Sequence, residues 1–262
     1  MDFVTSADGT AIAYERAGRG QPIVFVSGAF NDHHTCAPVA ELLADDFTVL
    51  TYDRRARGES GDTRPYAIDR EVEDLAALID LVGGSAAVFG YSSGALLALA
   101  AAAAKTPISR LALYEAPFAI DSWRDRSDLP ARLDDLVQQG RCEDAVTLFQ
   151  AEGIGLPPEV VAQIRQSPMF PALAAIAQST VYDATITAAY AVPDPALMSV
   201  PQPVLVMHGA GTWPPLPQAA QALAGALPDG RHREIPGSVN HGIPAPATAA
   251  AVRTFLSSFL DG

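Results

Sequence analysis

Short apolar runs alternate with amphipathic stretches along most of this chain. Runs such as PIVFVS (22–27) and PVLVMH (203–208) contain almost no polar positions, which is typical of strands covered on both faces. Strands are predicted at 11–18, 22–27, 47–53, 86–91, 110–115, 203–208 and about 231–235. This alternation of strands and helices predicts an α/β fold with a mostly parallel twisted sheet and helices on both of its faces.

Two of the intervening helices have a clear apolar face. In residues 71–84 the apolar side chains recur at helical spacing, and the pair Gly83-Gly84 ends the pattern. A similar stripe occurs near the end of the chain. The two faces comprise Val72, Leu75, Leu78, Ile79 and Val82 in the first helix, and Val252, Phe255, Leu256, Phe259 and Leu260 in the last. We expect both faces to pack against the sheet.

The pattern changes between about residues 117 and 200. This segment contains no convincing strand, is helical in pattern and is interrupted by several prolines. It also carries the aromatic residues Trp123, Phe149, Phe170, Tyr182 and Tyr190. We predict a core of residues 1–116 and 201–262, with residues 117–200 inserted as a helical lid (cap) subdomain over the carboxyl ends of the strands, where ligands bind in open α/β sheets. A simpler alternative is that most of these aromatics only pack the lid onto the core.

Residues 88–101 carry the most informative motif. An apolar strand runs into the turn Gly90-Tyr91-Ser92-Ser93-Gly94, a match to G-x-S-x-G, and an Ala/Leu-rich helix follows. Small residues two before and two after Ser92 leave room for the strand and helix that flank such a sharp turn. The turn would raise the Ser92 hydroxyl above the sheet and direct free helix N–H groups at the same point. We interpret Ser92 as a nucleophile, the alternative being a chance match in a chain rich in Gly and Ala.

Two further segments follow strands in a comparable way. Residues 27–30 read Ser-Gly-Ala-Phe, and residues 53–60 read DRRARGES. With these segments and the serine turn, the chain resembles the α/β-hydrolase superfamily, in its lidded branch of small esterases, lactonases and cofactor-free haloperoxidases. Ser27 replaces the histidine of the family's His-Gly-x-x segment, and Ala56 replaces a glycine of its Asp-x-Arg-Gly-x-Gly-x-Ser turn. The resemblance covers nearly the whole chain and implies that Asp53 anchors a turn and is not a catalyst.

The resemblance also implies the remaining parts of a hydrolase site. The N–H groups of Ala29 and Ser93 would form an oxyanion hole. His241 would be the base, since it lies on a Gly/Asn-rich loop between a short strand and the last helix. The other histidines are interpreted as surface or pocket-lining residues (His33, His34), a core residue (His208) and a surface residue (His232).

A catalytic triad also needs a carboxylate that orients the histidine. The turn at 209–213, Gly-Ala-Gly-Thr-Trp, contains none, whereas the preceding predicted strand ends in Glu115. That strand would lie between the strand of Ser92 and the strand before this turn, and the superfamily is known to place its acid at either strand end. The order Ser92, Glu115, His241 also fits the family's Ser…Asp/Glu…His order. The alternatives are a structural role for Glu115 with a Ser–His dyad, or an acid from the lid at Asp183 or Asp194.

Composition restricts the partners and the compartment. The chain has 262 residues, of which 49% are hydrophobic, and a formal net charge of −13. A surface of this charge argues against nucleic acid or an anionic membrane as a partner. The cysteines, Cys36 and Cys142, form no metal motif or disulfide framework, so we expect free thiols in a reducing compartment. No signal-peptide pattern and no membrane-length apolar run occurs, so we expect a cytoplasmic protein and leave homo-oligomerisation open.

These features predict a serine hydrolase that cleaves a small lipophilic ester or lactone through a Ser92–His241–Glu115 triad and an acyl-enzyme. No metal motif or organic-cofactor motif occurs, so we expect no cofactor. The substrate pocket is expected to include Phe30, Tyr91 and Trp213. Two alternatives are a non-hydrolytic enzyme of the same fold, such as a cyclase, lyase or acyltransferase of a natural-product pathway, and a receptor with a vestigial triad. The absent acid in the turn at 209–213 favours the first of these alternatives.

Overall fold

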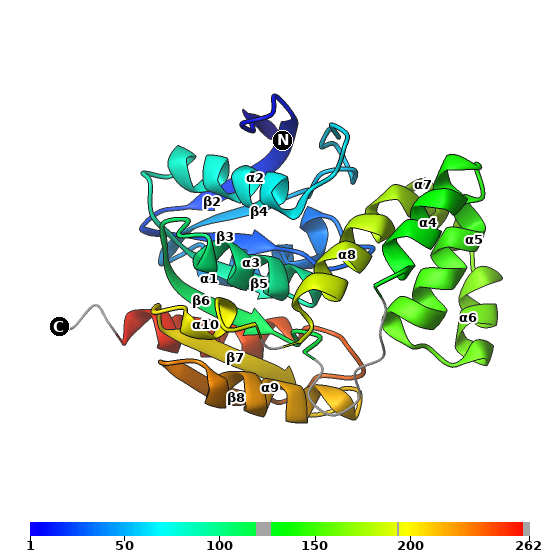
Figure 1. Ribbon diagram of the computed structural model, residues 1–262. Coiled ribbons are helices and arrows are strands. Elements are labelled where there is room, and N and C mark those ends of the chain that lie inside the picture. The colour runs from blue at the N-terminus through cyan, green and yellow to red at the C-terminus, as the bar shows by residue number, and fades with distance from the viewer. Residues whose placement is uncertain (119–126, 193, 259–262) are drawn as a thin grey trace.

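The computed structural model describes residues 1–118, 127–192 and 194–258. They form one eight-stranded sheet with helices packed around it (Figure 1). The strand order is β1-β2-β4-β3-β5-β6-β7-β8. β1 and β2 pair antiparallel, as do β2 and β4, and every other pairing is parallel. The strands are β1 (Asp2–Thr5), β2 (Ala11–Gly18), β3 (Gln21–Val26), β4 (Phe47–Tyr52), β5 (Ala86–Tyr91), β6 (Ile108–Tyr114), β7 (Val204–Gly209) and β8 (Gly230–Ile235). The predicted sheet is confirmed, with β1 as an edge strand that the sequence pattern did not indicate because its side chains are mostly exposed.

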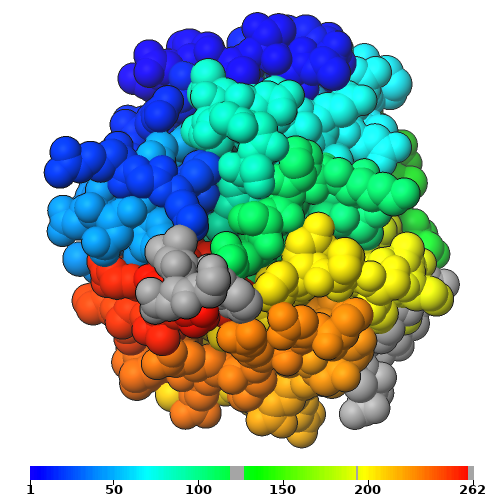
Figure 2. Space-filling model, turned by 90° about the vertical axis from the view of Figure 1, so that its left-hand side faces the viewer, coloured from blue at the N-terminus to red at the C-terminus, as the bar shows by residue number. Residues whose placement is uncertain are grey.

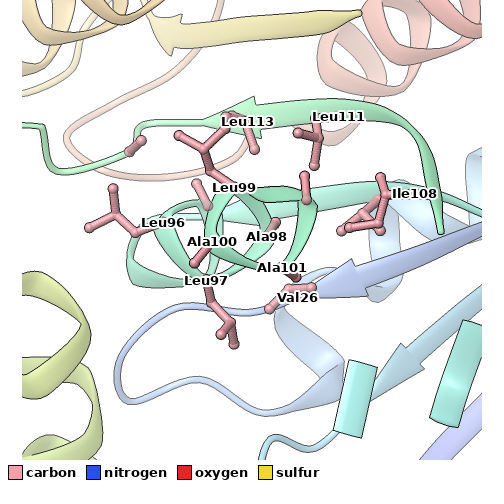
Figure 3. Packing of buried hydrophobic residues seen from close by; sticks show 14 of the residues in the cluster. Val26, Leu96, Leu97, Ala98, Leu99, Ala100, Ala101, Ile108, Leu111 and Leu113 are labelled. Atoms are coloured by element: carbon pink, nitrogen blue, oxygen red, sulfur yellow. The ribbon is translucent and has the colours of Figure 1, made fainter. Parts of the chain in front are cut away.

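Helices cover both faces of the sheet, as predicted. Successive residues of β3 alternate between the faces, so Val24 and Val26 belong to the apolar cluster that includes α2, α3 and α9, whereas Ile23 and Phe25 belong to the cluster that includes α1 and α10. Figure 3 shows Val26 and Leu113 against the side chains of α3, which is buried almost throughout. These helices are α1 (Ala37–Leu43), α2 (Ile68–Leu81), α3 (Ser93–Ala103), α9 (Pro215–Ala226) and α10 (Ala245–Ser257), preceded by the 3₁₀ turn η1 (His33–Thr35).

The predicted apolar helix faces are the buried ones. In α2, Leu75, Leu78 and Ile79 are buried in the core, and Val72 and Val82 pack against it while half-buried. In α10 the buried members are Val252, Phe255 and Leu256. Phe259, Leu260 and the lid residue Trp123 lie outside the described residues.

Between β6 and β7 the chain forms a separate group of helices, which we call the insertion. Its elements are α4 (Leu129–Gln138), α5 (Cys142–Leu148), the π-helix η2 (Phe149–Ile154), α6 (Pro158–Arg165), α7 (Phe170–Ala175), α8 (Ala177–Tyr190) and the 3₁₀ turn η3 (Leu197–Ser199). Its apolar cluster includes Phe149, Phe170 and Tyr182, and Phe30 and Tyr66 of the core pack against that cluster. α8 also contacts α2 and α3. The insertion therefore packs on the core mainly through α8 and η3, which contact α3, and through its apolar cluster, which contacts Phe30 and Tyr66.

Figure 1 places the insertion beside the carboxyl ends of the strands. Figure 2 views the opposite side, where the part of the chain before the insertion (blue to green) and the part after it (yellow to red) together form most of the visible surface. The core is thus built from segments on both sides of the insertion in the sequence, and the candidate site lies at the edge that faces the insertion.

Candidate active site

Ser92 occupies the apex of a strained turn between β5 and α3. Its φ and ψ are 55° and −125°, a conformation that residues other than glycine rarely adopt. A Cβ on Gly90 would lie 2.6 Å from the Ala95 Cα, and a Cβ on Gly94 would lie 2.4 Å from the Val26 carbonyl oxygen. These close approaches provide the steric reason for the small residues of the G-x-S-x-G pattern.

Glu115 follows β6 directly, and its side chain is buried. One carboxylate oxygen accepts a hydrogen bond from the Gly209 N–H at 2.9 Å, and the other hydrogen-bonds Nδ1 of His241. Like Ser92, Glu115 has a positive φ, 51°, and such strained backbone is concentrated at functional sites. The predicted contact between Glu115 and His241 is therefore present, and β6 lies between β5 and β7 as expected.

The last residue of β7, Gly209, and Gly211 in the turn after it are packed too closely for either to carry a carboxylate. A Cβ on Gly209 would lie 2.1 Å from Ser238 Oγ, and a Cβ on Gly211 would lie 2.4 Å from the Ser238 carbonyl oxygen. The Asn240 N–H donates to the Gly211 carbonyl at 2.9 Å. The loop that carries His241 thus rests directly on this turn, and the two glycines allow that approach.

Aromatic side chains hold His241 from two sides. The Trp213 ring stacks on the imidazole with centroids 4.8 Å apart and an interplanar angle of 16°, and the Tyr91 ring centroid lies 5.0 Å away. The Tyr91 hydroxyl donates to the His241 carbonyl at 2.6 Å, and the Tyr114 hydroxyl donates to the Gly242 carbonyl at 3.1 Å. Burial raises the pKa of Tyr114 to about 12 and also raises the pKa of Tyr91, so both hydroxyls remain donors at neutral pH.

Residues 27–30 pass beside the serine turn. A Cβ on Gly28 would lie 2.7 Å from the Ser92 Cβ, so only glycine fits there. Asn31 Nδ2 donates to the Ala29 carbonyl at 2.6 Å. Phe30 has a φ of 60°, and its ring meets Phe149 of the insertion edge-on with centroids 5.5 Å apart. The segment is therefore fixed against both the serine turn and the insertion.

A group of buried charges lies behind residues 27–30, and sequence analysis missed it. Arg54 donates to both carboxylate oxygens of Glu71, at 2.7 Å each, and to Asp183 Oδ1 at 2.9 Å. Arg57 donates to Asp183 Oδ2 at 2.8 Å. All four side chains are almost completely buried. The available signal was the presence of three arginines within residues 53–60 of a chain whose net charge is −13.

The two lid carboxylates that were alternative triad acids have other hydrogen-bond partners in the structure. Asp183 is committed to Arg54 and Arg57. Burial raises the pKa of Asp183, but the charges of Arg57 and Arg54 outweigh burial and hold that pKa below its usual value. Asp194 is exposed, and its Oδ1 accepts from the Ala196 N–H at 2.7 Å, which is a local turn contact.

Asp53 is an anchor for its turn, as expected. Its buried carboxylate accepts from the backbone N–H groups of His33 and Glu59, each at 2.9 Å. It also hydrogen-bonds the His33 ring through Nδ1 at 2.8 Å. His33 was expected to lie at the surface or to line the pocket. The surface position is wrong, because His33 is buried and its imidazole is held by the carboxylate of Asp53, 20 residues later in the chain.

The other histidines match their predicted positions. His34 and His232 are exposed, whereas His208 is buried and stacks on His232 with centroids 5.0 Å apart. Both cysteines are free, and burial raises the pKa of the Cys36 thiol to about 12, which disfavours the reactive thiolate.

One cluster among the described residues has groups suited to a metal ion. Asp32, His33 and His34 each place a candidate ligand atom within 4.8 Å of the others. Asp32 Oδ1, however, accepts from the His34 N–H at 2.9 Å, and the His33 ring bonds Asp53. Internal hydrogen bonds therefore account for this arrangement, and we assign it no metal-binding role.

Comparison with known proteins identifies the family. Residues 23–254 match the model of the alpha/beta hydrolase family. The chain belongs to this family. The fold of this α/β hydrolase is shared with a crystal structure of an alpha/beta hydrolase from Sphaerobacter thermophilus DSM 20745, which is 45% identical, covers 97% of this chain and 100% of the other, and superposes with a TM-score of 0.89.

More distant solved structures share the fold of this α/β hydrolase. The enol-lactonase from Burkholderia xenovorans LB400 is 23% identical, with a TM-score of 0.72 over 98% of this chain and 100% of the other. The esterase RhEst1 from Rhodococcus sp. ECU1013 is 24% identical, with a TM-score of 0.67 over 98% of each chain. In the part of the chain that the structure describes, no helix combines the length and apolar character needed to cross a membrane.

Proposed function

We propose that this chain is a serine hydrolase that cleaves a small lipophilic ester or lactone through Ser92, His241 and Glu115. The observation that carries the proposal is the hydrogen bond between Glu115 and His241 Nδ1, at the edge of the sheet where the strained Ser92 turn lies. A buried carboxylate on Nδ1 favours the tautomer whose Nε2 can accept a proton.

In the proposed mechanism His241 Nε2 takes the proton of the Ser92 hydroxyl while the serine oxygen attacks the acyl carbonyl. The N–H groups of Ala29 and Ser93 stabilise the oxyanion of the tetrahedral intermediate. The intermediate collapses when protonated His241 gives its proton to the leaving alkoxide. Water, activated by the same histidine, then attacks the acyl-enzyme and releases the acid.

The environment of the site supports an apolar substrate. Phe30 and Trp213 are both half-buried. Phe30 ends the oxyanion segment and packs on Phe149, and Trp213 stacks on the imidazole of His241. The insertion packs against Phe30 and would act as a cap that excludes water from the acyl-enzyme. The missing acid after β7 favoured a non-hydrolytic enzyme of the same fold, and the hydrogen bond between Glu115 and His241 supports the hydrolytic alternative instead.

The proposal is tested with a fluorophosphonate probe and a short-chain chromogenic ester. The wild-type protein should hydrolyse the ester and carry the label on Ser92. Ser92→Ala should lose activity to background, with an unchanged melting temperature and circular dichroism spectrum. Ser109→Ala is a matched control, because Ser109 is exposed near the amino end of β6, and it should keep the activity and the label on Ser92. Labelling of another residue with Ser92 unmodified, or full turnover by Ser92→Ala, would contradict the proposal.

A further inference from the structure

Two arginines donate to carbonyl groups of the segment that forms the proposed oxyanion hole. Arg57 Nη1 donates to the Gly28 carbonyl at 2.6 Å, and Arg54 Nη1 donates to the Ser27 carbonyl at 3.2 Å. Both guanidinium groups are almost completely buried. The segment is therefore held from behind by cations that lie in the protein interior.

The bond to Gly28 fixes the direction of the proposed donor, Ala29. The Gly28 carbonyl and the Ala29 N–H belong to one planar trans peptide, so they point in opposite directions. An arginine that holds the oxygen on one side consequently holds the N–H on the other side, away from Arg57. A cationic donor on the oxygen also polarises the peptide and strengthens the N–H as a donor.

Asp183 connects these contacts to the second donor. Its Oδ2 accepts from Arg57 at 2.8 Å, and its Oδ1 accepts from Arg54 at 2.9 Å and from the Ser93 hydroxyl at 2.7 Å. Asp183 thus contacts Ser93 directly and reaches the Gly28–Ala29 peptide through Arg57. One carboxylate, carried by α8 of the insertion, lies behind both proposed donors.

A purely structural ion pair is the simpler explanation. One general argument and one observation speak against it. Replacing a buried ion pair with apolar residues is often neutral or stabilising, so stability alone is weak support for retaining one. In addition, Arg57 Nε has no hydrogen-bond partner among the described residues although it is buried. The orientation of Arg57 is therefore better explained by its two remaining contacts, Gly28 and Asp183, than by satisfaction of its own donors.

We propose that Asp183 is a positioning residue for the oxyanion hole, acting on Ala29 through Arg57 and on Ser93 through its hydroxyl. This inference rests on the proposed function. In it the insertion contributes to catalysis from behind the site, without contact with the substrate, in addition to covering it.

The test compares Asp183→Asn with Asp74→Asn, a matched control. Asp74 is equally buried and pairs with a buried arginine of the same turn, Arg55, through bonds of 2.7 and 2.8 Å. Among the described residues, neither Asp74 nor Arg55 hydrogen-bonds residues 27–30. Asp183→Asn should lower kcat and the affinity for a boronic acid about 10- to 100-fold, somewhat less than the loss of an oxyanion donor. Its KM should change less than about threefold, since the loss is confined to the tetrahedral state.

Asp74→Asn should lower the melting temperature about as much as Asp183→Asn does, with kcat within about twofold of the wild type. Equal loss of kcat in the two variants, or full kcat in Asp183→Asn, would overturn the proposal. If Asp183→Asn does not fold, Arg57→Lys serves, because a lysine keeps the charge but lacks the fork that reaches both Gly28 and Asp183. Its kcat should fall about tenfold, and wild-type kcat would overturn the proposal.

Amide spectra separate this inference from the proposed function. The ¹H–¹⁵N signals of Ala29 and Ser93 should shift in Asp183→Asn and remain in place in Asp74→Asn. Unmoved signals in Asp183→Asn overturn the positioning role whatever reaction the protein catalyses. Shifted signals in a protein that hydrolyses no ester would support the positioning role and contradict the proposed function.

Discussion

The turns after β6 and β7 lie next to each other at one edge of the sheet. They differ in the side chains that they carry and in how closely other residues pack against them. The turn after β6 carries Glu115, whose carboxylate bonds both the Gly209 N–H and His241. The turn after β7 carries two glycines that press against the loop of His241. Because neighbouring parallel strands end at the same edge, a carboxylate can reach the same histidine from either strand.

The largest expected effect comes from removing the carboxylate of the first turn. Glu115→Gln should lower kcat by on the order of 10²–10⁴, as loss of a triad acid does, with little change in KM. Glu115→Asp is the matched control for charge, and it should recover only part of the activity because its side chain is one methylene shorter. Steady-state kinetics on a chromogenic ester measure both variants. Full activity in Glu115→Gln would mean that the site works as a Ser–His dyad.

The next effect comes from adding volume to the second turn. Gly211→Ala should lower the free energy of unfolding by about 1–3 kcal/mol, since the new Cβ would meet the Ser238 carbonyl at 2.4 Å. It should also lower kcat about tenfold or more by displacing the His241 loop, an effect of the size that misplaced catalytic groups produce. Gly225→Ala is the control, because Gly225 lies exposed in α9 with open space around it, and it should stabilise the protein by about 0.5–1 kcal/mol. Urea unfolding measures the stability of both variants. An unchanged free energy of unfolding in Gly211→Ala would show that the second turn has room for a side chain after all.

The smallest effect concerns the aromatic ring that the second turn does supply. Trp213→Leu should lower kcat about three- to tenfold, because the indole no longer stacks on the imidazolium formed during the reaction. Trp213→Phe keeps an aromatic face and should lie between the wild type and Trp213→Leu. If instead KM rises in both variants while kcat is unchanged, Trp213 acts only on substrate binding.

The sheet and the serine turn could be predicted from the sequence because their causes are local. Doubly covered strands need continuous apolar runs, and the turn at Ser92 needs glycine on both sides. Glu115 could be predicted as a candidate because the order of neighbouring strands brings distant turns together. The edge strand β1 lacked an apolar pattern, since its side chains are mostly exposed.

The contacts of Asp183 could not be predicted in the same way. Its partner Arg57 lies 126 residues earlier in the chain, and the two meet only because α8 returns from the insertion to the core. A single aspartate in a helical segment gives no indication of whether it faces solvent or a buried arginine. For the same reason the sequence placed Asp183 among the candidate acids, and His33 near the surface, although buried charges hold both side chains.

The position of Asp183 on α8 affects how this enzyme could be re-engineered. Inserted helical segments are natural modules to exchange when a new substrate range is wanted, and residues 127–192 would be the obvious graft. A chimera made in that way would leave Arg54 and Arg57 with one counter-charge, Glu71, in place of two. An uncompensated buried charge is strongly destabilising. A transplanted insertion must therefore bring a carboxylate to this position, or the two arginines must be redesigned together with it.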